Sequence, residues 1–145
     1  MPSVIEELSG EDGVLDHARI SARVVDWQTR IVGLYAEITS WFPDLRADRT
    51  GTVGMNEQVM QAYDVAPVRL PVLRLLAGPD QVAKFVPHGL WIIGTNGRLD
   101  LFAAAQFVIV DRSETFTSPR WEIAPALRRR QAELFTREAL LRAIA

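Results

Sequence analysis

The hydrophobic positions in the first third of the chain recur with a helical period. Between Asp16 and Phe42 the intervals alternate between four and three residues, which is the spacing of one helix face. The stripe consists of Ile20, Val24, Trp27, Ile31, Leu34, Ile38 and Trp41. Asp16 is the predicted N-cap, and Pro43 explains the stop because a residue before proline disfavours the helical conformation. The pattern predicts one long amphipathic helix over 16–42, with Arg23 and Arg30 on a polar side.

The predicted helix is long for such a small chain. At about 1.5 Å per residue it would span roughly 40 Å, which is close to the full width of a domain of this size. Its stripe would therefore either pack across the protein's own sheet or be shared with a second copy of the chain. The regular, aromatic stripe Ile20–Trp41 leads us to expect a homodimer through this helix.

From Val68 onward the pattern changes to short apolar runs separated by Gly, Pro and Asp, which is typical of strands. The predicted strands are Val68–Leu76, Gln81–Val86, two arms of a hairpin within Leu90–Phe102, Gln106–Asp111 and Arg120–Ala124. Pro87-His88-Gly89 is predicted to turn into the hairpin, and a seventh strand is an option within Leu127–Leu134. Met55–Tyr63 fits a short helix and a strand equally well.

The dipeptide Asn96-Gly97 is the strongest turn signal in the chain, because both residues tolerate the positive φ of a type I′ hairpin turn. A two-residue turn at this point pairs Thr95 with Arg98 and Trp91 with Phe102, and successive residues then face opposite sides. One predicted face is apolar and looks at the core: Leu90, Ile92, Gly94, Leu99 and Leu101. The other predicted face is mixed: Trp91, Ile93, Thr95, Arg98, Asp100 and Phe102.

The mixed face supports two interpretations. It is either a partly solvated strand face with an ordinary charge pair, or a concave binding surface with an aromatic floor and polar anchors. Our candidate binding residues are Trp91, Arg98, Asp100 and Phe102, in which Trp91 forms the floor and the charged pair forms the anchors.

The two ends of the chain complete the predicted architecture. Residues 1–15 are expected to form a flexible or short helical arm, and 16–145 a single domain. A short helix is predicted from Arg137, with Thr136 as its cap and Phe135 packed against Leu140. The order predicts an α+β fold with a long N-terminal helix, an antiparallel meander sheet of about five to seven strands and a short C-terminal helix.

The composition narrows the chemistry. The 145 residues contain no cysteine, which excludes disulfides, thiolate zinc sites and cysteine nucleophiles. No apolar run approaches the roughly 18–20 residues of a membrane helix, and the acidic start lacks the features of a signal peptide. We therefore expect a cytoplasmic protein without a membrane partner. Lys84 is the only lysine among many arginines, which suggests a bacterial source.

Charge is distributed unevenly along the chain. Residues 1–66 carry 5 Arg and 11 Asp or Glu, whereas residues 112–145 carry 7 Arg and 4 Glu. The run Arg128–Arg130 would suit a phosphate or an acidic partner. This excess is too small to argue for nucleic-acid binding by itself, so nucleic acid is an unlikely partner.

The search for catalytic motifs is largely negative. The sequence has no phosphate-binding loop, dinucleotide fingerprint, His-Glu-x-x-His or Gly-x-Ser-x-Gly motif, and we expect no cofactor and no metal. The preferred interpretation is a non-catalytic module that binds a protein or a small molecule. One alternative is an enzyme with a sparse site of Arg98, Asp100 and His88, which requires His88 within hydrogen-bond reach of Asp100. The other is a nucleic-acid-binding accessory protein that uses the basic C-terminal segment.

Overall fold

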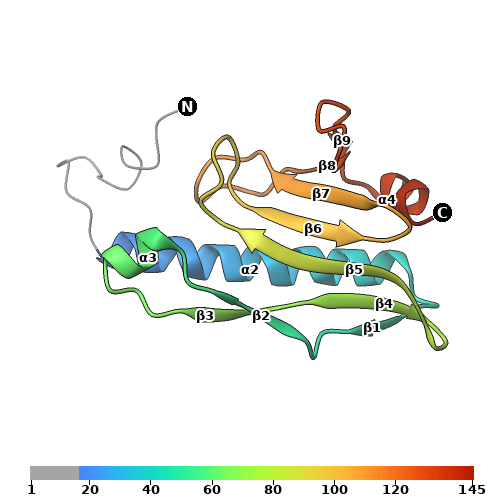
Figure 1. The fold of residues 1–145 in the computed structure, drawn as a ribbon, viewed down its shortest axis with the longest axis horizontal. Coiled ribbons are helices and arrows are strands. Elements are labelled where there is room, and N and C mark those ends of the chain that lie inside the picture. Colours follow the sequence, from blue (N-terminus) through green and yellow to red (C-terminus); the bar gives the residue numbers. More distant parts are fainter. Residues whose placement is uncertain (1–16) are drawn as a thin grey trace.

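The computed structural model describes residues 17–145 and has the predicted α+β architecture (Figure 1). A long helix, α2 (His17–Trp41), precedes a seven-stranded antiparallel sheet, and a short helix, α4 (Arg137–Ile144), follows it. The expected N-terminal arm and the Asp16 cap lie outside the described residues.

The sheet is a meander with one added edge strand. Its strands, in spatial order, are β1 (Arg46–Asp48), β4 (Leu73–Ala77), β5 (Asp80–Gly89), β6 (Arg98–Phe102), β7 (Gln106–Asp111), β8 (Trp121–Pro125) and β9 (Glu133–Leu134). A separate two-stranded ribbon contains β2 (Thr52–Met55) and β3 (Val68–Pro71), with helix α3 (Gln58–Ala62) between them. We call the sheet face toward α2 the inner face and the opposite one the outer face.

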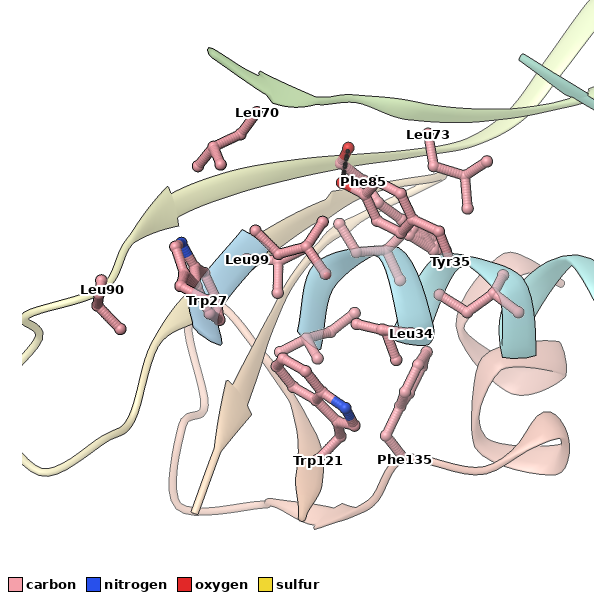
Figure 2. Close-up of a cluster of buried hydrophobic side chains, with 14 of the residues drawn as sticks. Trp27, Leu34, Tyr35, Leu70, Leu73, Phe85, Leu90, Leu99, Trp121 and Phe135 are labelled. Carbon is pink, nitrogen blue, oxygen red and sulfur yellow. Dashed lines mark hydrogen bonds between the residues drawn. The ribbon is translucent and has the colours of Figure 1, made fainter. Parts of the chain in front are cut away.

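The sheet curves around α2, and the predicted stripe forms the centre of the core (Figures 1 and 2). Six stripe residues are 3% exposed or less: Ile20, Val24, Trp27, Ile31, Leu34 and Ile38. Trp41, the last of the stripe, is half-buried. Tyr35 joins this core and donates its hydroxyl to the carbonyls of Pro71 at 2.8 Å and Phe85 at 3.2 Å. The stripe is therefore buried within a single chain.

Several predicted strand boundaries are wrong. Val68–Leu76 divides at Val72, so its two halves, β3 and β4, belong to different sheets. The strand predicted to end at Val86 continues through Pro87-His88 to Gly89, with a bulge between Pro87 and Gly89 in its pairing with β6. Of the optional strand within Leu127–Leu134, only Glu133–Leu134 pairs with β8. The ambiguous stretch Met55–Tyr63 contains helix α3.

The predicted two-residue hairpin turn is also wrong. The structure pairs Gly89 with Arg98 and Lys84 with Phe102, so residues 90–97 form a long loop. Asn96 is engaged elsewhere, because its backbone N–H donates to the carbonyl of Asp111 at 2.8 Å. Gly97 has a positive φ of 118°, as the turn signal required, but in this structure it lies against α2 instead of in a two-residue turn. Tertiary contacts have thus overridden the local turn preference.

The C-terminal helix forms as predicted. Thr136 is its N-cap and accepts a hydrogen bond from the backbone N–H of Ala139 at 3.1 Å. Phe135 and Leu140 are both buried in the core, at 8% and 0% exposure. The cap and the apolar pair together fasten the end of the chain to the core.

Candidate functional site

Strand β6 separates core residues from candidate site residues. Leu99 and Leu101 are fully buried in the core, so Arg98, Asp100 and Phe102 lie on the outer face. The hairpin register predicted that Trp91 pairs with Phe102, but Phe102 pairs with Lys84 instead. Trp91 lies in loop 90–97 against α2, with the guanidinium of Arg23 5.5 Å from the ring centroid. The structure thus brings Arg98 and Asp100 together and places Trp91 elsewhere.

Arg98, Asp100 and His88 form a connected polar cluster. Arg98 donates from Nε and Nη2 to Oδ1 of Asp100, at 3.0 and 2.8 Å. Nδ1 of His88 lies 3.2 Å from Oδ2 of the same carboxylate. The contact between His88 and Asp100 that a sparse enzymatic site requires is therefore present, and the imidazole side chain is 47% exposed.

A shallow cavity, which we call the outer-face hollow, lies beside Arg98. Its volume is about 150 Å³, and it lies over β6, β7 and β8, between loop 90–97 and loop 126–132. Val108, Val110 and Ala124 line it with apolar side chains that are only 4%, 9% and 5% exposed. The complete lining is Ile92, Ile93, Thr95, Arg98, Val108, Val110, Arg112, Glu122, Ile123, Ala124, Arg129 and Ala132. His88 is not among these residues, so the imidazole does not face this hollow.

The charged residues of the hollow are three arginines and one glutamate. Glu122 lies 3.5 Å from Nε of Arg112 and 3.8 Å from Nη2 of Arg120. Arg112 also donates to the carbonyl of Gly94 at 2.8 Å, which ties it to loop 90–97. Arg129 makes no ion pair with any residue between 17 and 145. The hollow is thus positive in a chain whose formal net charge is −2.

The loops around the hollow carry exposed apolar side chains. Ile93, which lines it, is 93% exposed, and Leu127, in the loop that carries Arg129, is 98% exposed. Loop 112–120, next to loop 90–97, adds Phe116, which is 50% exposed and has a φ of 61°. That φ is rare for a bulky residue and is tolerated only where its surroundings hold it.

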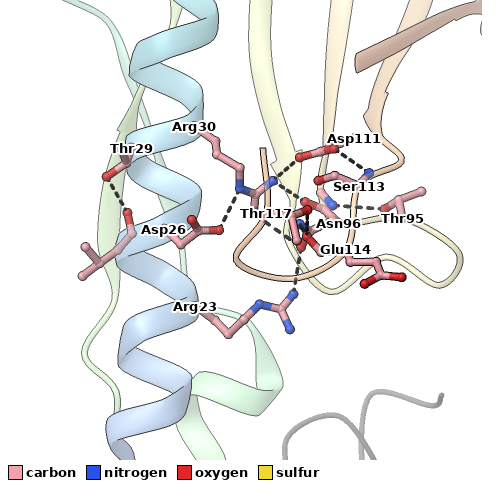
Figure 3. A network of polar contacts seen from close by, with 12 residues as sticks. Arg23, Asp26, Thr29, Arg30, Thr95, Asn96, Asp111, Ser113, Glu114 and Thr117 are labelled. Atoms are coloured by element: carbon pink, nitrogen blue, oxygen red, sulfur yellow. Dashed lines mark hydrogen bonds and ion pairs between the residues drawn. The ribbon is translucent and has the colours of Figure 1, made fainter. Parts of the chain in front are cut away.

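A buried ion-pair network fixes the loops beside the hollow (Figure 3). Arg30, on α2, donates to Asp26 and to Oδ2 of Asp111, both at 2.8 Å, and to the carbonyl of Asn96 at 2.6 Å. Oδ1 of Asp111 accepts from the backbone N–H groups of Ser113 and Arg120, at 2.8 and 2.9 Å. Because buried charges are costly unless their hydrogen bonds are made, this network holds both loops against α2.

Arg23 extends the network along α2. It is 2% exposed, and its Nη2 donates to Oδ1 of Asn96 at 3.3 Å. Burial, with a contribution from the nearby charge of Arg30, lowers the pKa of Arg23 to about 10, so the side chain remains a cation at neutral pH. The sequence pattern placed Arg23 and Arg30 on a polar side of the helix, whereas both are buried in the structure.

One sequence signal indicated that both sides of β7 are covered, although it did not identify the hollow. Phe107-Val108-Ile109-Val110 is a continuous apolar run, whereas a strand with one solvated face alternates. The run predicted a well-buried strand, and the structure shows that the outer side of β7 is covered by the two flanking loops. Arg112 and Arg129 carried no such signal, since only the fold brings them together.

Within residues 17–145, no group of three or more His, Asp or Glu side chains is placed to hold a metal ion. None of the helices described there combines the length and the hydropathy needed to cross a membrane. Comparison of the chain with protein-family models, with curated proteins and with solved structures finds no match.

Proposed function

We propose that the protein is a non-catalytic interaction module that binds a protein or small-molecule partner at the outer-face hollow. The observation that carries this proposal is the combination of an apolar cavity with the almost fully exposed Ile93 in its lining. Leu127, which is similarly exposed, belongs to the loop that supplies Arg129 to the lining. Exposed apolar groups next to arginines are characteristic of binding surfaces. The proposed setting is the bacterial cytoplasm, which agrees with a sequence that lacks cysteine.

Rigid loops support this proposal. The hydrogen bonds of Asn96 and Asp111 connect loops 90–97 and 112–120 to each other and to Arg30. A binding surface built on fixed loops loses little conformational entropy when a partner binds. The proposed role of the buried network is therefore to hold the surface in one shape.

A fragment screen tests the location of the site. Uniformly ¹⁵N-labelled protein is titrated with a library of small aromatic and carboxylate compounds, and amide shifts are recorded by NMR. We expect the shifts to cluster at Ile93, Val110 and Arg129. Ala132→Trp, which places an indole at the hollow, should abolish them, whereas Ala104→Trp in the β6–β7 turn should not. Shifts that map to the space between α4 and β8, or an absence of shifts, would refute the proposal.

An enzyme with a sparse site is the second candidate, and the 3.2 Å contact between His88 and Asp100 favours it. An imidazole oriented by a carboxylate is the arrangement used for general-base and nucleophilic catalysis. Hydrolysis of p-nitrophenyl acetate is a direct probe of this group. The enzyme candidate predicts a rate above that of free imidazole, which His88→Gln and Asp100→Asn both remove. A wild-type rate equal to that of His88→Gln eliminates it.

The homodimer remains part of the proposal, at a different surface of the same helix. The stripe Ile20–Ile38 is occupied by the core, whereas Val25 and Val32 on the opposite side of α2 are 59% and 52% exposed. Ala22, Thr29 and Ala36 continue this exposed line without a charged side chain. Sedimentation should show a dimer at tens of micromolar that Val25→Glu/Val32→Glu converts to a monomer. A wild-type monomer at this concentration would remove the dimer.

A further inference from the structure

Loop 126–132 contributes an arginine of the hollow, Arg129, that forms no ion pair with the residues described by the structure. Its turn is closed by hydrogen bonds from the N–H of Arg128 to the carbonyl of Pro125, at 3.0 Å, and from the N–H of Gln131 to the carbonyl of Arg128, at 2.9 Å. Arg129 projects from this turn, is exposed and lines the hollow. Among the residues that the structure describes, no carboxylate lies within ion-pair distance of it.

The other two arginines of the hollow each lie beside a carboxylate. Arg98 is held by Asp100 at 2.8 Å, and Arg112 lies 3.5 Å from Glu122. A guanidinium binds a carboxylate through two parallel hydrogen bonds, so Arg129 matches one acidic side chain particularly well. Arg128 and Arg130 on either side of it increase the local positive potential and attract an acidic partner.

The apolar part of the hollow defines the second feature of the partner. A cavity of about 150 Å³ has the volume that accommodates a benzene-sized group. Val108, Val110 and Ala124 would contact that group, and Ile93, which also lines the hollow, would cover one side of it. A side chain such as Leu or Phe fits this description, whereas a phosphate does not.

We infer that the outer-face hollow binds a linear peptide segment of a partner protein, in which one apolar side chain enters the hollow and a neighbouring Asp or Glu pairs with Arg129. This inference rests on the proposed function and specifies the partner. A peptide is favoured over nucleic acid because the cavity is lined by apolar side chains, which suit an apolar side chain and not a phosphate. The exposed side chains of Ile93 and Leu127 would also have no role on a phosphate backbone.

The test is a selection of peptides on the folded wild-type protein. A phage-displayed library of random 12-residue peptides is panned, and the enriched peptides are synthesised with a fluorophore and measured by fluorescence anisotropy. We expect the enriched sequences to share an acidic residue within a few positions of Leu or Phe. Arg129→Glu should weaken binding at least tenfold. The matched control, Arg46→Glu on the outer face of β1 at the opposite edge of the sheet, should change it less than twofold.

The possible outcomes separate this inference from the proposal on which it rests. Enriched peptides that are neutral or basic, or that bind Arg129→Glu as tightly as wild type, would overturn the inference. So would tighter, salt-sensitive binding of a labelled single-stranded 20-nucleotide DNA. In each case the fragment shifts at Ile93 and Val110 decide the proposed function independently, because the aromatic compounds of that screen can produce them without an acidic group. Loss of peptide binding in Ala132→Trp but not in Ala104→Trp would support both the peptide inference and the proposed function.

Discussion

Gly97 lies directly against the indole ring of Trp27. A Cβ built at Gly97 would stand 2.3 Å from Cζ3 of that ring, well inside van der Waals contact, and the residue has a φ of 118°. Trp27 is fully buried at the centre of α2. The contact therefore fixes the position at which the loop before β6 meets the helix, and it requires a residue without a side chain.

Gly97→Ala should destabilise the protein by about 2–5 kcal/mol, because it adds backbone strain to a clash with a buried ring. The measurement is urea unfolding followed by circular dichroism. Gly94→Ala is the control, since Gly94 also has a positive φ, 81°, but no atom lies within 4 Å of an added Cβ. It should cost only about 1–2 kcal/mol. Equal losses in the two variants would show that the contact with Trp27 has no energetic weight.

Arg30→Met should cost about 3–5 kcal/mol, because it leaves the carboxylate of Asp111 buried without its cationic partner. Asp111 is 0% exposed, so water does not replace the lost hydrogen bond. Arg142→Met provides the comparison, since the Arg142–Glu133 pair is exposed on both sides and should be worth less than about 1 kcal/mol. Chemical denaturation of the two variants measures this difference. A loss below 1 kcal/mol for Arg30→Met would contradict a structural role for the network.

The stability of the protein should fall at alkaline pH through Tyr35. Burial raises the pKa of this phenol above its ordinary value of about 10. Above pH 10 the unfolded chain therefore releases a proton that the folded chain retains, and the free energy of unfolding decreases as pH rises. Tyr35→Phe lacks this group, so its stability should decline less between pH 9 and 11, although it loses about 1 kcal/mol at neutral pH with its two hydrogen bonds. Parallel pH profiles for the two proteins would contradict this assignment.

Thr136→Ala should cost about 1 kcal/mol, because the hydroxyl caps the first turn of α4. Thr29→Ala is the matched control, since the Thr29 hydroxyl donates only to the carbonyl of Val25 within α2 and alanine has the higher helix propensity. That variant should be neutral or slightly more stable. Thermal unfolding of both variants compares the two threonines, and equal melting temperatures would refute the capping role.

The sequence by itself determined the elements whose information is local. The alternating intervals of four and three fixed α2 and its buried stripe, because a helix repeats every 3.6 residues and one face must leave water. Thr136 and Phe135 located the start of α4, because a capping hydroxyl and the apolar residue before it are local signals. The alternation along β6 correctly predicted that Leu99 and Leu101 face the core.

Only the tertiary structure decided the register of β5 with β6 and the composition of the hollow. Asn96-Gly97 favours a tight turn in isolation, but hydrogen bonds to Asp111 and contact with Trp27 together outweigh that preference. Arg98, Arg112 and Arg129 come from three separate segments, so their proximity depends on strand pairing that no local pattern encodes. Local propensities are worth about a kilocalorie or less per residue, and several simultaneous long-range contacts exceed that amount wherever the two conflict.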